Sequence, residues 1–75
     1  MTYYIISKDD CHWCDKAIKL LEGETVEVFH FNQHPMLLKL MDHAKLRTVP
    51  QIWVNDHYIG GYQELVKHIR HVGVA

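Results

Sequence analysis

The sequence predicts a small α/β domain in which strands and helices follow one another in the order β-α-β-α-β-β-α. Two observations support this prediction. Short β-rich runs end at polar residues or glycine, and the segments between several of them repeat apolar residues at helical spacing. At 75 residues the chain is long enough for one domain, residues 1–75, with a compact core. We therefore expect a four-stranded mixed sheet flanked by helices.

The only two cysteines, Cys11 and Cys14, lie where the first predicted strand leads into the first predicted helix. Residues 3–6 are aromatic and β-branched and stop at a polar stretch, which predicts a buried strand. A helix follows and closes at Gly23, because apolar side chains recur at helical spacing at Cys14, Ala17, Ile18 and Leu21. Cys11 then lies at the positive end of the helix dipole, with Cys14 one turn in and within disulfide reach. This spacing is typical of a thiol–disulfide exchange pair.

A second strand and a second helix follow. Residues 25–31 alternate and are β-rich, and the turn at residues 22–24 leads into them. Pro35 suits the first position of a helix. The apolar residues of that helix are Leu37, Leu40, Met41 and Ala44.

The last third of the chain predicts a hairpin and a final helix. Residues 52–54 and 58–59 are short strands, and residues 55–57 between them predict a tight turn. Gly60 and Gly61 end the second strand. The helix that follows runs roughly to the C-terminus and is marked by Leu65, Ile69 and Val72. The first half of the sheet is therefore expected to be parallel and the second half antiparallel.

Composition narrows the function classes. A net charge of −1 gives no basic field, so we expect no nucleic-acid partner. No apolar run approaches the roughly 20 residues that a bilayer requires, so we expect no membrane segment. The first residues show neither a basic stretch nor a cleavage site, so we expect no export signal. A single Cys-x-x-Cys pair is not a secreted disulfide framework, and we therefore expect a cytoplasmic protein.

Three stretches occur in a fixed order and spacing that covers nearly the whole chain. They are Ser7-Lys8 ahead of Cys11-His12-Trp13-Cys14, then Arg47-Thr48-Val49-Pro50-Gln51-Ile52, and then Ile59-Gly60-Gly61-Tyr62. Together they resemble the glutaredoxins of the thioredoxin-fold superfamily. The resemblance implies a thioredoxin-like fold. It also implies a glutathione-dependent dithiol enzyme that reduces protein disulfides and glutathione mixed disulfides.

The resemblance also implies a binding site. Pro50 would be cis and would turn the backbone of Val49 toward the thiols, where an extended peptide can pair with it. Lys8 would contact the glycine carboxylate of glutathione. Gly60 and Gly61 allow close backbone approach, and the first turn of the following helix can hold a carboxylate. The residues expected to bind glutathione are Lys8, Trp13, Thr48, Val49, Pro50, Gly61, Tyr62 and Gln63.

The two cysteines have different expected roles. Cys11 is the expected nucleophile, because it lies at the exposed, dipole-facing end of the helix, and Cys14 is the expected resolving thiol. The implied partners are glutathione and disulfide-containing or glutathionylated proteins. Ribonucleotide reductase is a usual client of the family. We expect a monomer.

Some residues depart from the family pattern. His12 stands where proline is frequent, and Asp9 and Asp10 stand where small neutral residues are usual. A carboxylate at Asp10 can oppose a thiolate by repulsion, or it can cap the helix. Gln63 and Glu64 follow the glycine turn where the family commonly has Asp, Ser or Thr and then Asp.

Three alternatives to this function can be considered from the sequence. One is a redoxin of similar sequence that is reduced by a flavoprotein reductase. Another is an iron–sulfur cluster carrier, because glutaredoxins without proline after the first cysteine can bridge a cluster between two monomers with glutathione. The third is a zinc finger, whose loose spacing is met by Cys11, Cys14, His30 and His34. The sequence argues against it, because residues 26–31 alternate as a strand and Pro35 directly follows His34, so we expect no metal site.

Overall fold

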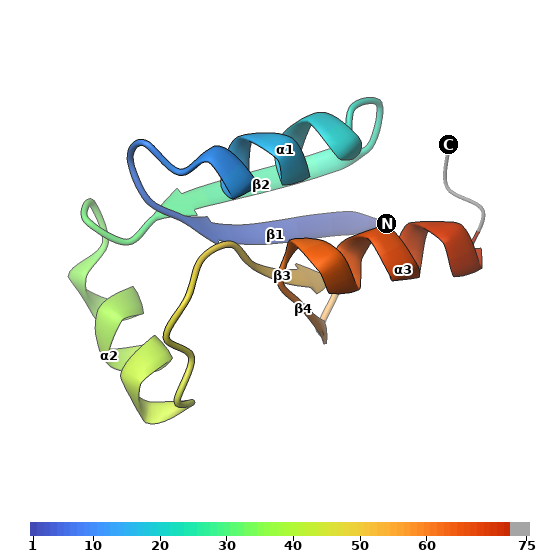
Figure 1. The fold of residues 1–75 in the computed structure, drawn as a ribbon. Coiled ribbons are helices and arrows are strands. Elements are labelled where there is room, and N and C mark those ends of the chain that lie inside the picture. Colours follow the sequence, from blue (N-terminus) through green and yellow to red (C-terminus); the bar gives the residue numbers. More distant parts are fainter. Residues whose placement is uncertain (73–75) are drawn as a thin grey trace.

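The structure is a computed structural model that describes residues 1–72, and its elements follow the predicted order (Figure 1). The strands are β1 (Thr2–Ser7), β2 (Thr25–His30), β3 (Gln51–Val54) and β4 (His57–Gly60). The helices are α1 (His12–Leu20), α2 (Pro35–His43) and α3 (Tyr62–Val72). Within residues 1–72 the helices are all too short or too polar to cross a bilayer. The order of strands and helices confirms the α/β prediction.

The four strands form one mixed sheet in the order β2-β1-β3-β4. β1 is parallel to β2, which requires the crossover that α1 provides, and antiparallel to β3. β3 and β4 form an antiparallel hairpin whose turn contains Asn55, with a φ of 53°. His57, which we assigned to this turn from the sequence, instead pairs with Val54 as the first residue of β4.

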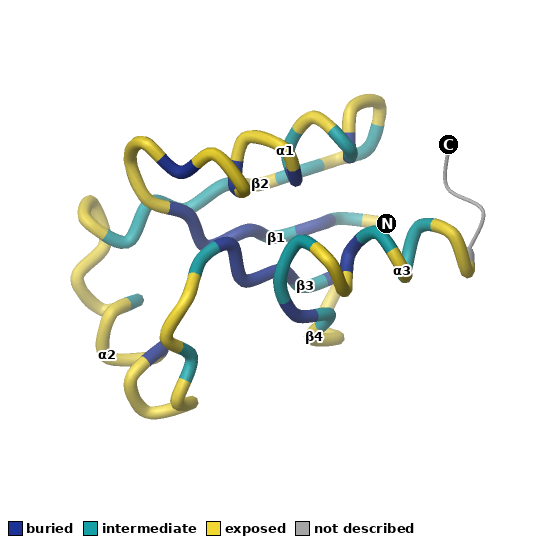
Figure 2. Tube along the Cα trace, in the orientation of Figure 1, coloured by how far each residue is buried: buried dark blue, intermediate teal, exposed yellow. Residues whose placement is uncertain are grey.

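The core lies between one face of the sheet and the inner sides of α1 and α3. Figure 2 shows that the buried positions gather along β1 and β3 and on the sides of α1 and α3 that face these strands. Side chains two apart on a strand share a face, so one face of β1 and one face of β3 supply the core residues. The cluster consists of Tyr3, Ile5, Ala17, Leu21, Ile52, Val54 and Leu65.

α2 lies apart from the other two helices, at the end of the sheet where β1 stops (Figure 1). Pro35 occupies its first turn, as predicted. Met41 is buried, but Leu40 is 52% exposed and Ala44 is also exposed. Helical spacing therefore predicted this helix correctly without predicting which of its residues are buried.

Candidate active site

A disulfide joins Cys11 and Cys14 at the N-terminus of α1, with their Cα atoms 5.2 Å apart. Cys11 is the N-cap residue, and its Sγ accepts a hydrogen bond from the Cys14 N–H at 3.2 Å. The first backbone bond of the helix runs from the Asp15 N–H to the Cys11 carbonyl at 3.1 Å. After reduction, the same N–H and the helix dipole would stabilise a thiolate on Cys11.

The expectation that Cys11 is exposed is wrong. Its exposed fraction is 7%, because its sulfur is bonded to Cys14 and drawn against the first turn of the helix. Cys14 is still more buried, at 1%. Cys11 also lines the neighbouring pocket and Cys14 does not. An incoming thiolate therefore meets the sulfur of Cys11 first.

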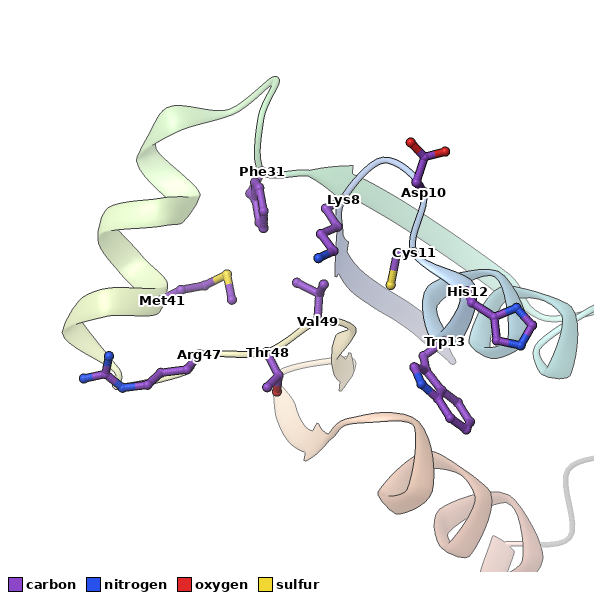
Figure 3. A pocket seen from close by; sticks show the side chains of 10 residues that line it. All are labelled: Lys8, Asp10, Cys11, His12, Trp13, Phe31, Met41, Arg47, Thr48 and Val49. Atoms are coloured by element: carbon purple, nitrogen blue, oxygen red, sulfur yellow. The ribbon is translucent and has the colours of Figure 1, made fainter.

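The pocket beside Cys11 has a volume of about 430 Å³, within the range of about 300–1,000 Å³ usual for ligand sites. Figure 3 shows the sulfur of Cys11 and the ammonium of Lys8 directed toward it, and the carboxylate of Asp10 directed away. The lining residues are Lys8, Asp10, Cys11, His12, Trp13, Phe31, Met41, Arg47, Thr48 and Val49.

A second pocket, of about 320 Å³, adjoins the first. The two share Trp13, Thr48 and Val49, so we treat them as one redox cleft. The second pocket is lined by Trp13, Thr48, Val49, Pro50, Gly61, Tyr62, Gln63 and Glu64. The structure therefore brings to this cleft every residue that the sequence predicted to bind glutathione, with Lys8 at one end and the glycine turn at the other.

The Val49–Pro50 peptide bond is cis, as the resemblance implied. Within residues 1–72, neither the N–H nor the carbonyl of Val49 takes part in a hydrogen bond. Because Val49 lines both pockets, its backbone offers an unpaired edge to an extended chain in the cleft.

Trp13 spans the cleft between α1 and α3. Its side chain is 49% exposed, and its ring centroid lies 5.4 Å from that of Tyr62. The Lys16 ammonium lies 4.9 Å from the centroid of the Trp13 ring, which adds a cation–π contact. This position agrees with the prediction that Trp13 projects beside the reactive sulfur rather than into the core.

Glu64 changes the expected anion site at the start of α3. Its Oε1 accepts a hydrogen bond from the Gly61 N–H at 2.8 Å, so a carboxylate of the protein itself lies beside the first turn, where a ligand carboxylate was expected. The side chain lies over the glycine turn, where a Cβ on Gly60 would come within 2.8 Å of Glu64 Cγ. A glutamate three residues after an N-cap is the spacing of a capping box, which is the signal that could have predicted this contact.

Sequence reasoning also missed three other residues of the cleft, Phe31, Met41 and Arg47. Phe31 follows β2 directly, Met41 comes from α2, and Arg47 precedes Thr48 in the chain. Only Arg47 carried a usable signal, because it adjoins the predicted loop and has a cationic side chain.

Asp9 and Asp10 differ in structure although they are neighbours. The Asp9 carboxylate accepts a hydrogen bond from Asn32 Nδ2 at 2.7 Å and lies 3.3 Å from Nδ1 of His30. Asp10 is exposed, and its φ is 55°. The alternative in which Asp10 caps the helix is wrong, because Cys11 holds the N-cap position.

The structure does not support the zinc-finger alternative. Cys11 and Cys14 are joined to each other, His30 ends β2, and His34 packs edge-on against Phe29. In the part of the chain that the structure describes, no group of three or more His, Cys, Asp or Glu side chains is placed to hold a metal ion.

Comparison with known proteins gives a family and a fold. The glutaredoxin family model matches residues 3–59. Among solved structures, NrdH-redoxin from Escherichia coli, described as glutaredoxin-like with a thioredoxin-like activity profile, has a TM-score of 0.81 and 19% identity, covering 100% of this chain and 99% of its own. Reduced Escherichia coli glutaredoxin has a TM-score of 0.74 and 25% identity, with 100% of both chains covered. The buckwheat glutaredoxin–glutathione complex has a TM-score of 0.76 and 23% identity, covering 95% of this chain and 69% of its own. No curated protein sequence matches the chain.

Proposed function

This chain belongs to the glutaredoxin family, and on that premise we propose that it is a glutathione-dependent thiol–disulfide oxidoreductase. One observation supports this proposal most directly. The Cys11–Cys14 disulfide lies at the N-terminus of α1 and adjoins a cleft with Lys8 at one end and the turn at Gly61 at the other. Its substrates would be protein disulfides and glutathione mixed disulfides.

Reduction of a protein disulfide follows from the positions of the two sulfurs. The Cys11 thiolate attacks one substrate sulfur, a mixed disulfide forms, and the first substrate thiolate leaves and takes a proton. The Cys14 thiolate then attacks Cys11 Sγ, and the second substrate thiolate leaves. The substrate gains two electrons, and the protein is left with the Cys11–Cys14 disulfide.

Two molecules of glutathione restore the dithiol. The first attacks Cys11, the more accessible sulfur, forms a mixed disulfide there and releases Cys14 as a thiolate. The second attacks the glutathione sulfur of that mixed disulfide, so that glutathione disulfide forms and Cys11 leaves as a thiolate. On a glutathionylated protein, Cys11 alone suffices, because it takes up the glutathionyl group and a second glutathione removes it.

The charges of the cleft match the two ends of glutathione. Lys8 and Arg47 line the end beside Cys11, where a lone glycine carboxylate would be attracted. Glu64 lines the other end, where it can accept a hydrogen bond from the γ-glutamyl ammonium. The Val49 backbone lies between the two ends and can pair with the backbone of the tripeptide.

A coupled assay tests the proposal. The protein, glutathione, glutathione reductase and NADPH would be mixed with a peptide–glutathione mixed disulfide, and NADPH oxidation would be followed. We expect a rate that depends on both the protein and the glutathione concentration. NADPH oxidation that does not rise with added protein would contradict the proposal.

A redoxin reduced by a flavoprotein reductase is the second candidate. The observation that favours it is the contact between Glu64 and the Gly61 N–H, which places a carboxylate of the protein where a glutathione carboxylate was expected to bind. Thioredoxin reductase with NADPH in place of glutathione distinguishes the two. A faster turnover with the reductase than with glutathione would favour this candidate.

We also propose that the protein acts as a monomer in the reducing cytoplasm, with ribonucleotide reductase among its clients. A lone Cys-x-x-Cys pair, without a further disulfide framework, supports the compartment. Reduction of oxidised ribonucleotide reductase by the purified protein would test the client directly.

A further inference from the structure

Three side chains behind the Val49 loop form a continuous chain of hydrogen bonds. Gln51 Nε2 donates to the Thr48 carbonyl at 2.8 Å and to Thr48 Oγ1 at 3.2 Å. The Tyr58 hydroxyl donates to Gln51 Oε1. Gln51 is only 4% exposed, and both its amide nitrogen and its amide oxygen have partners. None of these contacts was predicted from the sequence.

The register of the hairpin explains why Tyr58 reaches Gln51. Gln51 and Trp53 are two residues apart on β3 and share a face, and Tyr58 of β4 lies opposite Trp53, with ring centroids 5.2 Å apart. Gln51 is therefore the diagonal neighbour of Tyr58, within reach of a long side chain. This face is opposite the one on which Ile52 and Val54 join the core.

The Thr48 carbonyl sets the direction of every bond in this chain. A carbonyl can only accept, so the amide nitrogen of Gln51 faces Thr48 and its oxygen faces Tyr58, whose hydroxyl donates. Burial, and then repulsion from Glu64, raises the pKa of Tyr58 above its ordinary value of 10.0. The hydroxyl therefore keeps its proton near neutral pH.

Because the peptide unit is planar, fixing the direction of the Thr48 carbonyl also fixes the direction of the Val49 N–H in the cleft. The Thr48 carbonyl and the Val49 N–H belong to one planar trans peptide unit, in which they point in opposite directions. By holding the carbonyl, Gln51 fixes the Val49 N–H in the direction away from itself. Val49 lines both parts of the redox cleft, and its N–H has no partner in the described chain.

We propose that Gln51 is a positioning residue that aims the Val49 N–H at the backbone of an extended substrate, with Tyr58 as its outer support. This inference rests on the proposed function and names a determinant of its specificity for peptide disulfides. Gln51 lines neither pocket of the cleft, so it acts through Thr48 and Val49. Loss of Gln51 should weaken the binding of substrates that carry a peptide backbone. It should leave the reaction with small disulfides, which carry none, unchanged.

Single-turnover oxidation of the fully reduced protein, followed by tryptophan fluorescence, tests this prediction. The substrates are a cysteine-containing peptide disulfide and bis(2-hydroxyethyl) disulfide. Gln51→Met keeps the length of the side chain and removes its hydrogen bonds. We expect its half-saturating concentration of peptide disulfide to rise about tenfold, or about 1.4 kcal/mol. The limiting rate and the rate with the small disulfide should stay within about twofold of wild type.

Two further variants control the experiment. Tyr58→Phe removes only the outer hydroxyl and should raise the half-saturating concentration about threefold, which keeps the test available if Gln51→Met does not fold. Tyr4→Phe removes a tyrosine hydroxyl outside this chain of contacts and should behave as wild type. Equal losses with both substrates, or no change with the peptide, would overturn the inference.

A spectroscopic readout separates this inference from the proposed function. In the oxidised protein, the ¹H–¹⁵N resonance of Val49 should shift in Gln51→Met and in Tyr58→Phe, and should stay in place in Tyr4→Phe. If wild type reduces neither disulfide, the proposed function is wrong and the Val49 resonance still tests the positioning role. An unchanged Val49 resonance would overturn that role.

Discussion

At the scale of single residues, the two cysteines are chemically identical and differ only in where the fold places them. Cys11 caps α1 and lines the cleft, whereas Cys14 is one turn further in and almost fully buried. We therefore expect Cys11→Ser to abolish all exchange, and Cys14→Ser to lose reduction of protein disulfides while retaining removal of glutathione from glutathionylated peptide. The coupled assay measures both activities. A Cys14→Ser protein that is inactive on both substrates, beside an active Cys11→Ser protein, would reverse the assigned roles.

Lys8 is exposed, and its ammonium points toward the pocket that Cys11 lines (Figure 3). Because an exposed ion pair contributes about 0.5–1 kcal/mol, Lys8→Ala should raise the KM for glutathione about two- to fivefold, with little change in kcat. The effect should shrink as salt is added. Lys39→Ala, on the exposed part of α2, is the matched control. Equal effects of the two substitutions would mean that general charge, and not Lys8, attracts glutathione.

At the scale of elements, Asp9 in the loop after β1 contacts His30 at the end of β2 and accepts a hydrogen bond from Asn32 in the loop that follows. We expect Asp9→Ala to lower the free energy of unfolding by about 0.5–1 kcal/mol, since the contacts are near the surface. Chemical denaturation measures this loss. Asp10→Asn is the control, because asparagine tolerates the left-handed backbone at that position and the Asp10 carboxylate points away from the cleft. Equal losses in both variants would contradict a bracing role for Asp9.

The β3–β4 hairpin has an expected signature at alkaline pH. Burial, and then Glu64, raises the pKa of Tyr58, so the folded protein holds this proton to higher pH than the unfolded chain does. The resulting stability is complete below the ordinary tyrosine pKa of about 10 and is lost as pH rises through the folded-state value. Tyr58→Phe should therefore lose less stability than wild type between about pH 9 and pH 11. Denaturation midpoints at the two pH values give the comparison, and an equally steep loss in Tyr58→Phe would contradict the assignment.

Periodicity and turn residues predicted the elements because both are local properties. Pro35 marked the start of α2, and both strands of the hairpin were found, although β3 begins one residue earlier, at Gln51, and β4 one residue earlier, at His57. Burial on α2 was not predictable in the same way. An apolar stripe shows that a helix forms, but burial also depends on which other elements pack against the helix, and Leu40 is left 52% exposed while Met41 is buried.

At the scale of the whole molecule, the residues of the cleft were predictable and their mutual contacts were not. Lys8, Val49 and Gly61 were predicted to lie at the cleft because each belongs to a short motif, and the order and spacing of these motifs can be read from the sequence. The contact between Gln51 and Tyr58 depends on strand register and on the side-chain face, which no local pattern determines. The exposure of Cys11 was misjudged for a related reason, since it depends on a bond to Cys14 and on the walls of the cleft.

The distribution of charge over the whole cleft leads to the last prediction. The net charge of −1 gives no strong overall field, so a glutathione anion must be oriented locally, by Lys8 and Arg47 at one end and Glu64 at the other. Glu64→Gln keeps an oxygen that can accept from the Gly61 N–H and removes only the negative charge.

If Glu64 holds the γ-glutamyl ammonium, Glu64→Gln should raise the KM for glutathione about two- to fivefold, as expected for an exposed pair. Turnover with thioredoxin reductase should not change. NMR spectra of Cys14→Ser in its mixed disulfide with glutathione would be compared with and without Glu64→Gln. They would show whether the resonances that change belong to residues 60–64. Tighter glutathione binding in Glu64→Gln would mean that the carboxylate repels the ligand, and it would favour a redoxin reduced by a flavoprotein over a glutathione-dependent enzyme.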